Sequence, residues 1–268
     1  MFKLSVTHNG FVHACGHRGH SIGSPENTIA ALHATLEHGG TSAEIDVMLT
    51  KDHQIVLMHD LTLNRTTNGH GLVAAHTLEE IQLLEAGAWF APEFTGTRVP
   101  TLEEALTWSR DKLGLVVEIK EFQHVPRLIE VLGELLERTD SYDHAIFISF
   151  DHRVLYNLKQ ALPKARTEAI THERFLDPVA VLHAAHVDSV SIELEMFNLE
   201  DAQAIHDAGI AIRLHLPRPI ELEHFKSLGI DWESSVGPWL EEGLVDTISG
   251  DDVGFLSELI RHYPLRYG

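Results

Sequence analysis

The chain has 268 residues, of which 44% are hydrophobic, so it is long enough to bury the core of one large α/β domain. It carries 20 Lys and Arg against 40 Asp and Glu, and this formal net charge of −20 disfavours binding to nucleic acid or anionic lipid headgroups. We therefore expect no nucleic-acid partner and no stable membrane association.

The single cysteine, Cys15, excludes an internal disulfide framework. It lies in an apolar run, which favours a buried and unreactive thiol. Residues 1–11 lack the apolar segment and the cleavage site of a secretory signal, and no run reaches the ~18 apolar residues of a membrane span. These features predict a cytoplasmic protein. The oligomeric state is left open, a homo-oligomer included.

Short apolar runs alternate with segments of helical periodicity along the whole chain. The runs are Val12–His17, Ala43–Leu49, Leu115–Lys120, Ala145–Phe150, Arg166–Ile170, Ser189–Glu193, Ile210–Leu216 and Val245–Ser249. Strands that alternate with helices predict a parallel sheet, and at this length the sheet is expected to close. The predicted fold is a (β/α)8 TIM barrel that comprises residues 1–268 as a single domain.

Several of the helices between these runs have recognisable ends. Ser24-Pro25 is typical of an N-cap and first helical residue, and Gly39-Gly40 is expected to stop the same helix. Thr101 and Glu104 have capping-box spacing, and Asp177-Pro178 repeats the N-cap and proline pair. These signals place helices after the first strand, before the third and after the fifth.

One segment interrupts the alternation of strands and helices. Gln54–Asp60 also has the composition of a strand, but only three residues separate it from the strand that ends near Thr50. A parallel return needs a crossover of a dozen or more residues, so this pair must form an antiparallel hairpin. A turn centred on Asp52 would bring His59 back beside Asp46.

The residues after the hairpin, 61–99, are expected to form an excursion before the next main helix starts at Thr101. A short helix from Thr77 to about Glu85 is predicted within it. The hairpin and excursion, residues 50–100 approximately, thus follow the second strand of the barrel.

Charged side chains lie near the C-terminal ends of the first three strands, where the active site of such a barrel is found. A period of two places Glu44 and Asp46 on one face of the second strand, and Glu118 and Lys120 on one face of the third. Acids in apolar strands are costly, and a structural ion pair such as Glu118–Lys120 is one explanation. Three inward carboxylates at one rim instead favour a divalent cation, Mg²⁺ first, with Ca²⁺ or Mn²⁺ as alternatives.

Two histidines, His17 and His59, are expected to approach this cluster from different segments. A single histidine with apolar neighbours is more often a core residue, but two beside a carboxylate cluster indicate acid–base chemistry near neutral pH. Arg18 and Lys120 would supply the positive charge that an anionic phosphoryl oxygen requires.

These residues belong to a longer series of short motifs. The series comprises His17-Arg18-Gly19, Pro25-Glu26-Asn27-Thr28, Glu44-Ile45-Asp46-Val47, Thr50-Lys51-Asp52, His59-Asp60, Arg65-Thr66-Thr67, Pro100-Thr101-Leu102-Glu103-Glu104, Glu118-Ile119-Lys120 and Ile148-Ser149-Phe150. In this order and spacing the series resembles the glycerophosphodiester phosphodiesterases. The resemblance implies a barrel with catalytic His17 and His59, divalent-cation ligands Glu44, Asp46 and Glu118, and phosphate-side residues Arg18 and Lys120.

The C-terminal half resembles the family less closely. Where the family has a Trp-Thr-Val-Asn-like stretch at the end of the seventh strand, this chain has His215-Leu216-Pro217-Arg218. We therefore expect a more polar pocket, in which His215 and Glu193 contact the alcohol part of the substrate. Alternatively, Arg218 pairs with surface acids, and Trp232 or Trp239 from an additional segment supplies an aromatic wall.

The resemblance implies metal-dependent hydrolysis of glycerophosphodiesters, small-molecule substrates of lipid and glycerol metabolism, to an alcohol and sn-glycerol 3-phosphate. His17 is taken as the base and His59 as the acid. A phosphodiesterase of the same frame for lysophospholipids or sugar phosphodiesters is the nearest alternative. A catalytically silent phosphodiester-binding barrel would be expected to have lost part of the set. A sugar isomerase-type barrel would leave Arg18 and Lys120 unexplained.

Overall fold

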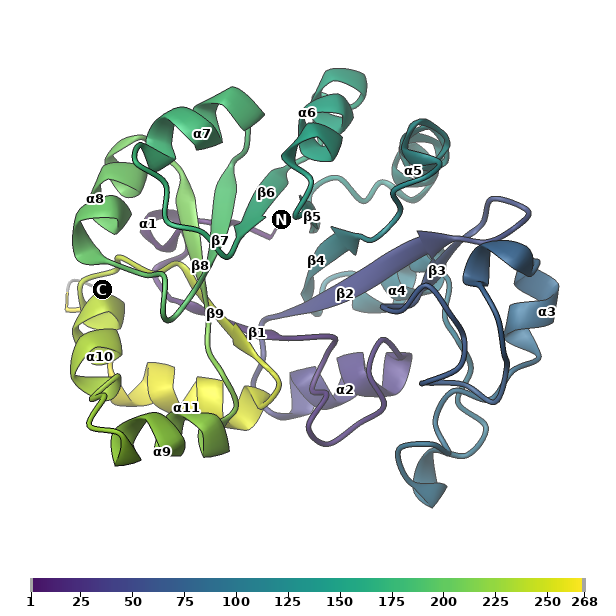
Figure 1. The fold of residues 1–268 in the computed structure, drawn as a ribbon, viewed down its shortest axis with the longest axis horizontal. Helices are drawn as coiled ribbons and strands as arrows, with labels where there is room; N and C mark the ends of the chain where they lie inside the picture. The colour runs from purple at the N-terminus through teal and green to yellow at the C-terminus, as the bar shows by residue number, and fades with distance from the viewer. Residues whose placement is uncertain (1, 267–268) are drawn as a thin grey trace.

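The computed structural model describes residues 2–266, and its centre is a closed barrel of parallel strands (Figure 1). The barrel order is β1-β2-β4-β5-β6-β7-β8-β9, and β9 pairs again with β1. The strands are β1 (His13–Gly16), β2 (Ser42–Leu49), β4 (Gly114–Ile119), β5 (Ala145–Ser149), β6 (Thr167–Thr171), β7 (Ser189–Glu193), β8 (Ala211–His215) and β9 (Thr247–Gly250). Each coincides with one of the predicted apolar runs, so the predicted TIM barrel is confirmed.

Helices surround the barrel, as the predicted alternation requires. They are α1 (Val6–Asn9), α2 (Ile29–Glu37), α4 (Leu102–Ser109), α5 (Val125–Thr139), α6 (His152–Ala161), α7 (Pro178–Ala185), α8 (Leu199–Asp207), α9 (Pro219–Ser227), α10 (Glu233–Glu241) and α11 (Val253–His262). Thr101 and Glu104 form the predicted capping box of α4, and Asp177 caps α7 with Pro178 in its first turn. These helix starts are confirmed because each depends only on local hydrogen bonds.

The start of α2 differs from the prediction. The helix begins at Ile29 with Thr28 as its N-cap, and not at Ser24-Pro25. Asn27 has a left-handed backbone, with φ 57°, and its side chain bonds both the backbone N–H and the carboxylate of Asp46. This tertiary contact holds the preceding residues in a loop, which the local sequence signal could not show. The helix ends before Gly39, whose φ is 83°, as predicted.

The predicted hairpin is confirmed, and its register agrees with the prediction. Strand β3 (Ile55–Leu57) runs antiparallel to β2, with Val47 opposite Leu57. The N–H of Met58 donates to the carbonyl of Asp46 at 3.0 Å, which brings the next residue, His59, to the barrel mouth.

The excursion after β3 has a small apolar core of its own. This core consists of Met48, Val56, Met58, Leu63, Val73, Ile81, Ala86 and Val99. Within the excursion lie η1 (Val73–Ala75), α3 (Leu78–Gln82) and η2 (Pro92–Phe94). Helix α3 has the predicted start, a capping box of Thr77 with Glu80, but it ends before Glu85. The excursion packs on the outward side of the hairpin (Figure 1), and this packing holds the segment after β3 in place.

One cluster of buried side chains in the barrel is apolar. Its members are Phe2, Cys15, Val116, Ile146, Ile148 and Ile170. Cys15 is buried, as predicted, and burial raises the pKa of its thiol to about 12. Among the described helices, none is long and apolar enough to cross a membrane.

Candidate active site at the barrel mouth

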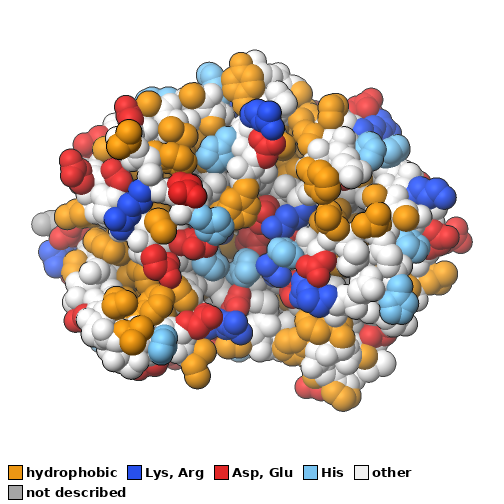
Figure 2. Space-filling model, in the orientation of Figure 1, with side chains coloured by type: hydrophobic (Ala, Val, Ile, Leu, Met, Phe, Trp, Pro, Cys, Tyr) orange, Lys and Arg blue, Asp and Glu red, His pale blue; other side chains and the backbone are white. Residues whose placement is uncertain are grey.

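A pocket of about 230 Å³ opens at the C-terminal ends of the strands. Figure 2 shows acidic, basic and histidine side chains gathered in the hollow at the centre of this face. The lining residues are His17, Arg18, Glu44, His59, Glu118, Lys120, Ile148, Phe150, Ile170, His172, Ser191, Glu193, Arg213 and His215. The structure thus brings the predicted site residues together, with Asp46 in contact beneath Arg18 and Lys120. A larger groove of about 650 Å³ lies outside the barrel beside α2 and α4, away from these residues.

Three buried carboxylates form the floor on one side of the pocket. Oxygen atoms of Glu44, Asp46 and Glu118 lie within 4.8 Å of one another, because Asp46 on β2 stands opposite Glu118 on β4. Burial, followed by the charges of Asp46 and Glu118, raises the pKa of Glu44 to about 8. Burial and the charge of Asp46 likewise raise the pKa of Glu118. The raised pKa values indicate that nearby positive charge does not fully compensate the three carboxylates.

Two cations partly compensate the three acids. Lys120 Nζ lies 2.6 Å from Glu118 Oε1 and 3.3 Å from Asp46 Oδ1. Arg18 Nε lies 3.5 Å from Asp46 Oδ2, and the backbone N–H of Arg18 donates to Glu44 Oε2 at 2.9 Å. The left-handed backbone of Arg18, with φ 57°, aims this N–H at Glu44.

The donor set fits a hard divalent cation. Glu44 Oε1 is buried and has no hydrogen-bond partner among the described residues. A buried acceptor without a partner costs free energy, and the raised pKa of Glu44 shows the same deficit of positive charge. An all-oxygen set of this kind suits Mg²⁺, Ca²⁺ or Mn²⁺ better than zinc. These residues can therefore hold such an ion.

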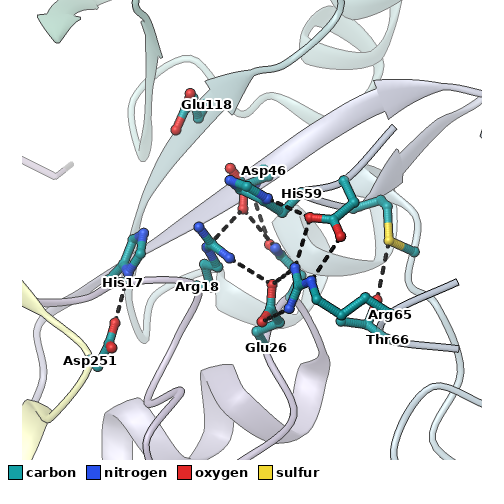
Figure 3. A network of polar contacts seen from close by, with 12 residues as sticks. His17, Arg18, Glu26, Asp46, His59, Arg65, Thr66, Glu118 and Asp251 are labelled. Carbon is teal, nitrogen blue, oxygen red and sulfur yellow. Dashed lines mark hydrogen bonds and ion pairs between the residues drawn. The ribbon is translucent and has the colours of Figure 1, made fainter. Parts of the chain in front are cut away.

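Each of the two histidines is held by a carboxylate. The Nδ1–H of His17 donates to Asp251 Oδ1 at 2.7 Å, and the Nδ1–H of His59 donates to Asp60 Oδ1 at 2.8 Å. Figure 3 shows the two rings on opposite sides of Arg18. With Nδ1 engaged in this way, Nε2 of each ring is left to exchange protons with a ligand in the pocket.

The environment of His17 makes its ring more basic than an ordinary imidazole. Burial opposes protonation, but the hydrogen bond to Asp251 and the charge of Glu44 outweigh it, so the pKa of His17 lies above its ordinary value. At Asp251 burial acts to raise the pKa of the carboxyl group, but the hydrogen bond from His17 and the nearby positive charges together outweigh it, so the pKa is lowered. Sequence reasoning assigned no role to Asp251 or Asp60. Asp60 directly follows His59 in the sequence, which could have signalled its role.

The other half of the pocket carries polar and aromatic side chains. Glu193 Oε1 lies 2.9 Å from His172 Nδ1, and the His172 ring stacks on Phe150 with 4.8 Å between ring centroids. Glu193 and His215 both line the pocket, as predicted. Its aromatic wall comes from Phe150 after β5, which the sequence motif contained without an assigned role.

The hydrogen bonds of His215 fix which ring nitrogen carries its proton. Ser249 Oγ accepts from the guanidinium of Arg213 at 3.4 Å and lies 3.2 Å from His215 Nδ1. An arginine can only donate, so the buried hydroxyl hydrogen of Ser249 is directed to Nδ1. The Nε2–H of His215 then faces the pocket as a neutral donor. Burial, followed by the charges of His17 and Arg213, lowers the pKa of His215 to about 3.

Arg213 is itself buried and paired. Its Nε and Nη2 lie 2.7 Å and 2.6 Å from Glu168 Oε1, and Ser189 donates to the other oxygen of that carboxylate at 2.8 Å. This pair accounts for the charge of Arg213, which sequence reasoning did not identify as part of the pocket.

The alternative prediction, in which Trp232 or Trp239 supplies an aromatic wall of the pocket, is wrong. Trp232 is buried near Phe255, and the Trp239 ring lies 4.1 Å from that of Phe197, so neither lines the pocket. Arg218 is half-exposed and lies 3.6 Å from both Glu221 and Asp251, so its pairing with acids is confirmed. Both tryptophans instead pack in the core of the C-terminal half of the barrel.

Comparisons with known proteins agree on one family. The model of the "Glycerophosphoryl diester phosphodiesterase family" matches residues 17–253. The chain is 42% identical over 159 residues to "Putative glycerophosphodiester phosphodiesterase YhdW" of Bacillus subtilis, a match of 59% of this chain and 65% of that protein. It is 37% identical over 185 residues to a glycerophosphodiester phosphodiesterase of Caldanaerobacter subterraneus, a match of 68% of this chain and 75% of that protein. The match thus spans just under two thirds of the first relative.

Two solved structures share the fold over nearly the whole chain. The glycerophosphodiester phosphodiesterase of Agrobacterium tumefaciens has a TM-score of 0.78 and 25% identity, with 92% of this chain and 100% of that chain covered. An Oleispira antarctica phosphodiesterase, solved with the product sn-glycerol-3-phosphate, has a TM-score of 0.80 and 26% identity, with coverage of 95% and 98%.

Proposed function

The chain belongs to the glycerophosphoryl diester phosphodiesterase family, and on this premise we propose that it hydrolyses glycerophosphodiesters to an alcohol and sn-glycerol 3-phosphate. One observation carries the proposal. One pocket is lined by two carboxylates of the buried cluster, with Asp46 beneath them, by two histidines fixed by carboxylates, and by the two cations Arg18 and Lys120. The names of the relatives and the product bound to the Oleispira antarctica phosphodiesterase support it.

A divalent cation is the cofactor of this proposal, with Mg²⁺ favoured and Ca²⁺ or Mn²⁺ as alternatives. Glu44, Asp46 and Glu118 would hold it, and when bound it would supply positive charge that offsets negative charge developing on a phosphoryl oxygen. Arg18 and Lys120 stand beside the same carboxylates, so their donors can bind further phosphoryl oxygens.

The two histidines would transfer protons on either side of the phosphorus. His17 would take a proton at Nε2 from the attacking nucleophile, and Asp251 would stabilise the imidazolium that results. The nucleophile is water, or the adjacent glycerol hydroxyl, which gives a cyclic phosphate that water then opens to sn-glycerol 3-phosphate. His59 would give a proton from Nε2 to the leaving alkoxide, with Asp60 holding its ring. Because both rings have the same carboxylate support, the assignment of base and acid rests on the experiment described in the Discussion.

The alcohol part of the substrate would lie against Phe150, Glu193 and His215. Phe150 offers an apolar ring face, Glu193 an acceptor, and His215 an N–H donor, which together suit a hydroxylated alcohol such as glycerol or inositol. These three side chains correspond to the more polar pocket that His215-Leu216-Pro217-Arg218 predicts.

The test is hydrolysis of a panel of phosphodiesters by the purified protein, with chelator alone and after Mg²⁺, Mn²⁺ or Ca²⁺ is added. The panel contains glycerophosphocholine, glycerophosphoinositol, a lysophospholipid and a sugar phosphodiester. We expect cation-dependent turnover with the glycerophosphodiesters preferred. Higher kcat/KM for the lysophospholipid would assign the alternative substrate class. Full activity after exhaustive chelation would contradict the role of the cation.

A further inference from the structure

Arg65 lies outside the pocket lining, yet its side chain makes four close hydrogen bonds beside it. The guanidinium donates to Asp60 through Nε and Nη2, at 2.8 Å and 2.9 Å. It also donates to Glu26 through Nη1 and Nη2, at 2.6 Å and 2.8 Å. One arginine therefore binds two carboxylates, each through two donors. Lysine cannot reproduce this planar arrangement.

Both carboxylates are hydrogen-bonded to residues of the candidate active site. Figure 3 shows Glu26 between Arg65 and Arg18. Asp60 Oδ1 accepts from His59 Nδ1 at 2.8 Å. Glu26 Oε1 accepts from Arg18 at 2.9 Å, and Arg18 lies against Asp46. The result is a continuous series of hydrogen bonds and ion pairs, His59–Asp60–Arg65–Glu26–Arg18–Asp46, which we call the Arg65 bridge.

The Arg65 bridge joins two segments that are distant in sequence. Glu26 belongs to the loop between β1 and α2, whereas Asp60 and Arg65 lie in the excursion after β3. Thr67 Oγ1 donates to the carbonyl of Leu63, which braces the turn that presents Arg65. The side chain of Thr66 is buried and donates to Met58 Sδ at 3.4 Å, which ties the same turn to the excursion core.

The charges along the bridge reinforce one another. Hydrogen bonds from Arg65, followed by the bond from His59, hold the pKa of Asp60 well below its ordinary value. At Glu26 burial acts against ionisation, but the bond from Arg65 and the charge of Arg18 outweigh it, and the pKa is lowered. Both carboxylates therefore stay ionised near neutral pH and keep their partners in place.

We propose that Arg65 is a positioning residue. Through Asp60 and Glu26, it fixes the position of the catalytic His59 relative to the phosphate-side Arg18. The proposal rests on the proposed function, because it assigns those two roles. This proposal assigns a role to the Arg65-Thr66-Thr67 motif, none of whose side chains lines the pocket. A purely structural clasp between the segments would use the same contacts, so the test must separate the two.

The test compares R65Q and R65K with the matched control R138Q. Arg138 also donates through Nε and Nη2 to one carboxylate, that of Glu103, on the outer surface between α5 and α4. We expect R65Q to lower kcat by about 10²-fold, as for loss of a positioned general acid. We expect R65K to recover only part of this loss and R138Q to leave turnover unchanged. Melting temperatures of R65Q and R138Q should differ by less than about 3 °C, since both arginines are largely surface residues.

Two measurements distinguish positioning from a structural clasp. Added guanidinium at sub-denaturing concentration should restore part of the kcat of R65Q. The double variant D60N/R65Q should be no slower than the slower single variant, because both act through His59. R65Q turnover within threefold of wild type, or a loss that guanidinium and R65K leave unchanged, would overturn the proposal.

A third measurement does not depend on the reaction. In ¹⁵N-histidine NMR spectra, Nδ1 of wild-type His59 should carry a proton held in the hydrogen bond to Asp60. R65Q should show this bond weakened, while R138Q keeps the wild-type signal. An unchanged His59 signal in R65Q would contradict the positioning role even if no substrate is found. A wild-type protein that is inactive on every phosphodiester but shows the predicted NMR change would instead contradict the proposed function alone.

Discussion

Removal of divalent cations should change the stability of this protein in a way that depends on pH, through Glu44. The folded-state pKa of Glu44 is raised to about 8 by burial and by Asp46 and Glu118. A carboxyl group whose pKa is raised on folding favours the folded state at low pH. That contribution is complete below the unfolded pKa and is lost as pH rises through the folded pKa. The cation-free protein should therefore lose stability between about pH 4.5 and pH 8.

The magnitude follows from the pKa of Glu44. A rise from 4.5 to about 8 corresponds to roughly 5 kcal/mol at ~1.4 kcal/mol per pH unit, which is an upper value because the three acids titrate together. A protein of this size shifts its Tm by ~2–4 °C per kcal/mol, so the increase in Tm on adding Mg²⁺ should be about 10 °C larger at pH 8 than at pH 5. Differential scanning calorimetry with EDTA or with excess MgCl₂ measures both values.

The variant E44Q should be stabilised in the same assay under the conditions in which the cation-free wild type loses stability. Glutamine removes the uncompensated charge, so in EDTA at pH 8 the variant should melt above the wild type, although it has lost a proposed cation ligand. The pH dependence of the cation-free Tm should also become shallower. A cation effect of equal size at pH 5 and pH 8, or an E44Q variant less stable than wild type in EDTA at pH 8, would refute the reasoning.

Three further predictions concern the proposed proton transfers and the alcohol side. H17A and H59A should each lower kcat by ~10²–10⁴-fold. A p-nitrophenyl phosphodiester, whose leaving group needs no proton, should partly restore the kcat of H59A only. Equal rescue of both variants would reject the assignment of His17 as base and His59 as acid. D251N should lower kcat by about 10²-fold while leaving KM within a few-fold, since Asp251 orients His17; a change in KM alone would indicate a binding role. H215W should change the ranking of kcat/KM among glycerophosphocholine, glycerophosphoinositol and a sugar phosphodiester, and an unchanged ranking would show that residue 215 does not shape the pocket.

The barrel could be predicted from the sequence because each strand is a short apolar run and the helices between them have local signals. The hairpin register was equally accessible, because a connection of three residues permits only an antiparallel return. The start of α2 was not, since Asn27 is fixed by Asp46, a partner on another element. A local capping signal cannot compete with a tertiary contact that the sequence does not display.

The candidate site shows the same division between local and distant information. The carboxylates, histidines and cations could be located from strand period and motif, and the structure places them in one pocket. The partner of His17, Asp251, lies 234 residues away in the sequence, and Glu26 lies 39 residues from Arg65. That Phe150 forms the aromatic wall could not be predicted, because this depends on which strand ends face the substrate across the closed barrel. Such pairings are set by the fold and have no local signal.

We propose that the pocket cleaves the bond between phosphorus and the alcohol oxygen and leaves the phosphate on glycerol. The most direct measurement is ³¹P NMR of glycerophosphocholine incubated with the Mg²⁺-loaded protein, with E118Q as the control. We expect loss of the diester signal and growth of the sn-glycerol 3-phosphate signal, with choline as the other product and little turnover by E118Q. Growth of phosphocholine in place of sn-glycerol 3-phosphate, or equal turnover by E118Q, would contradict it.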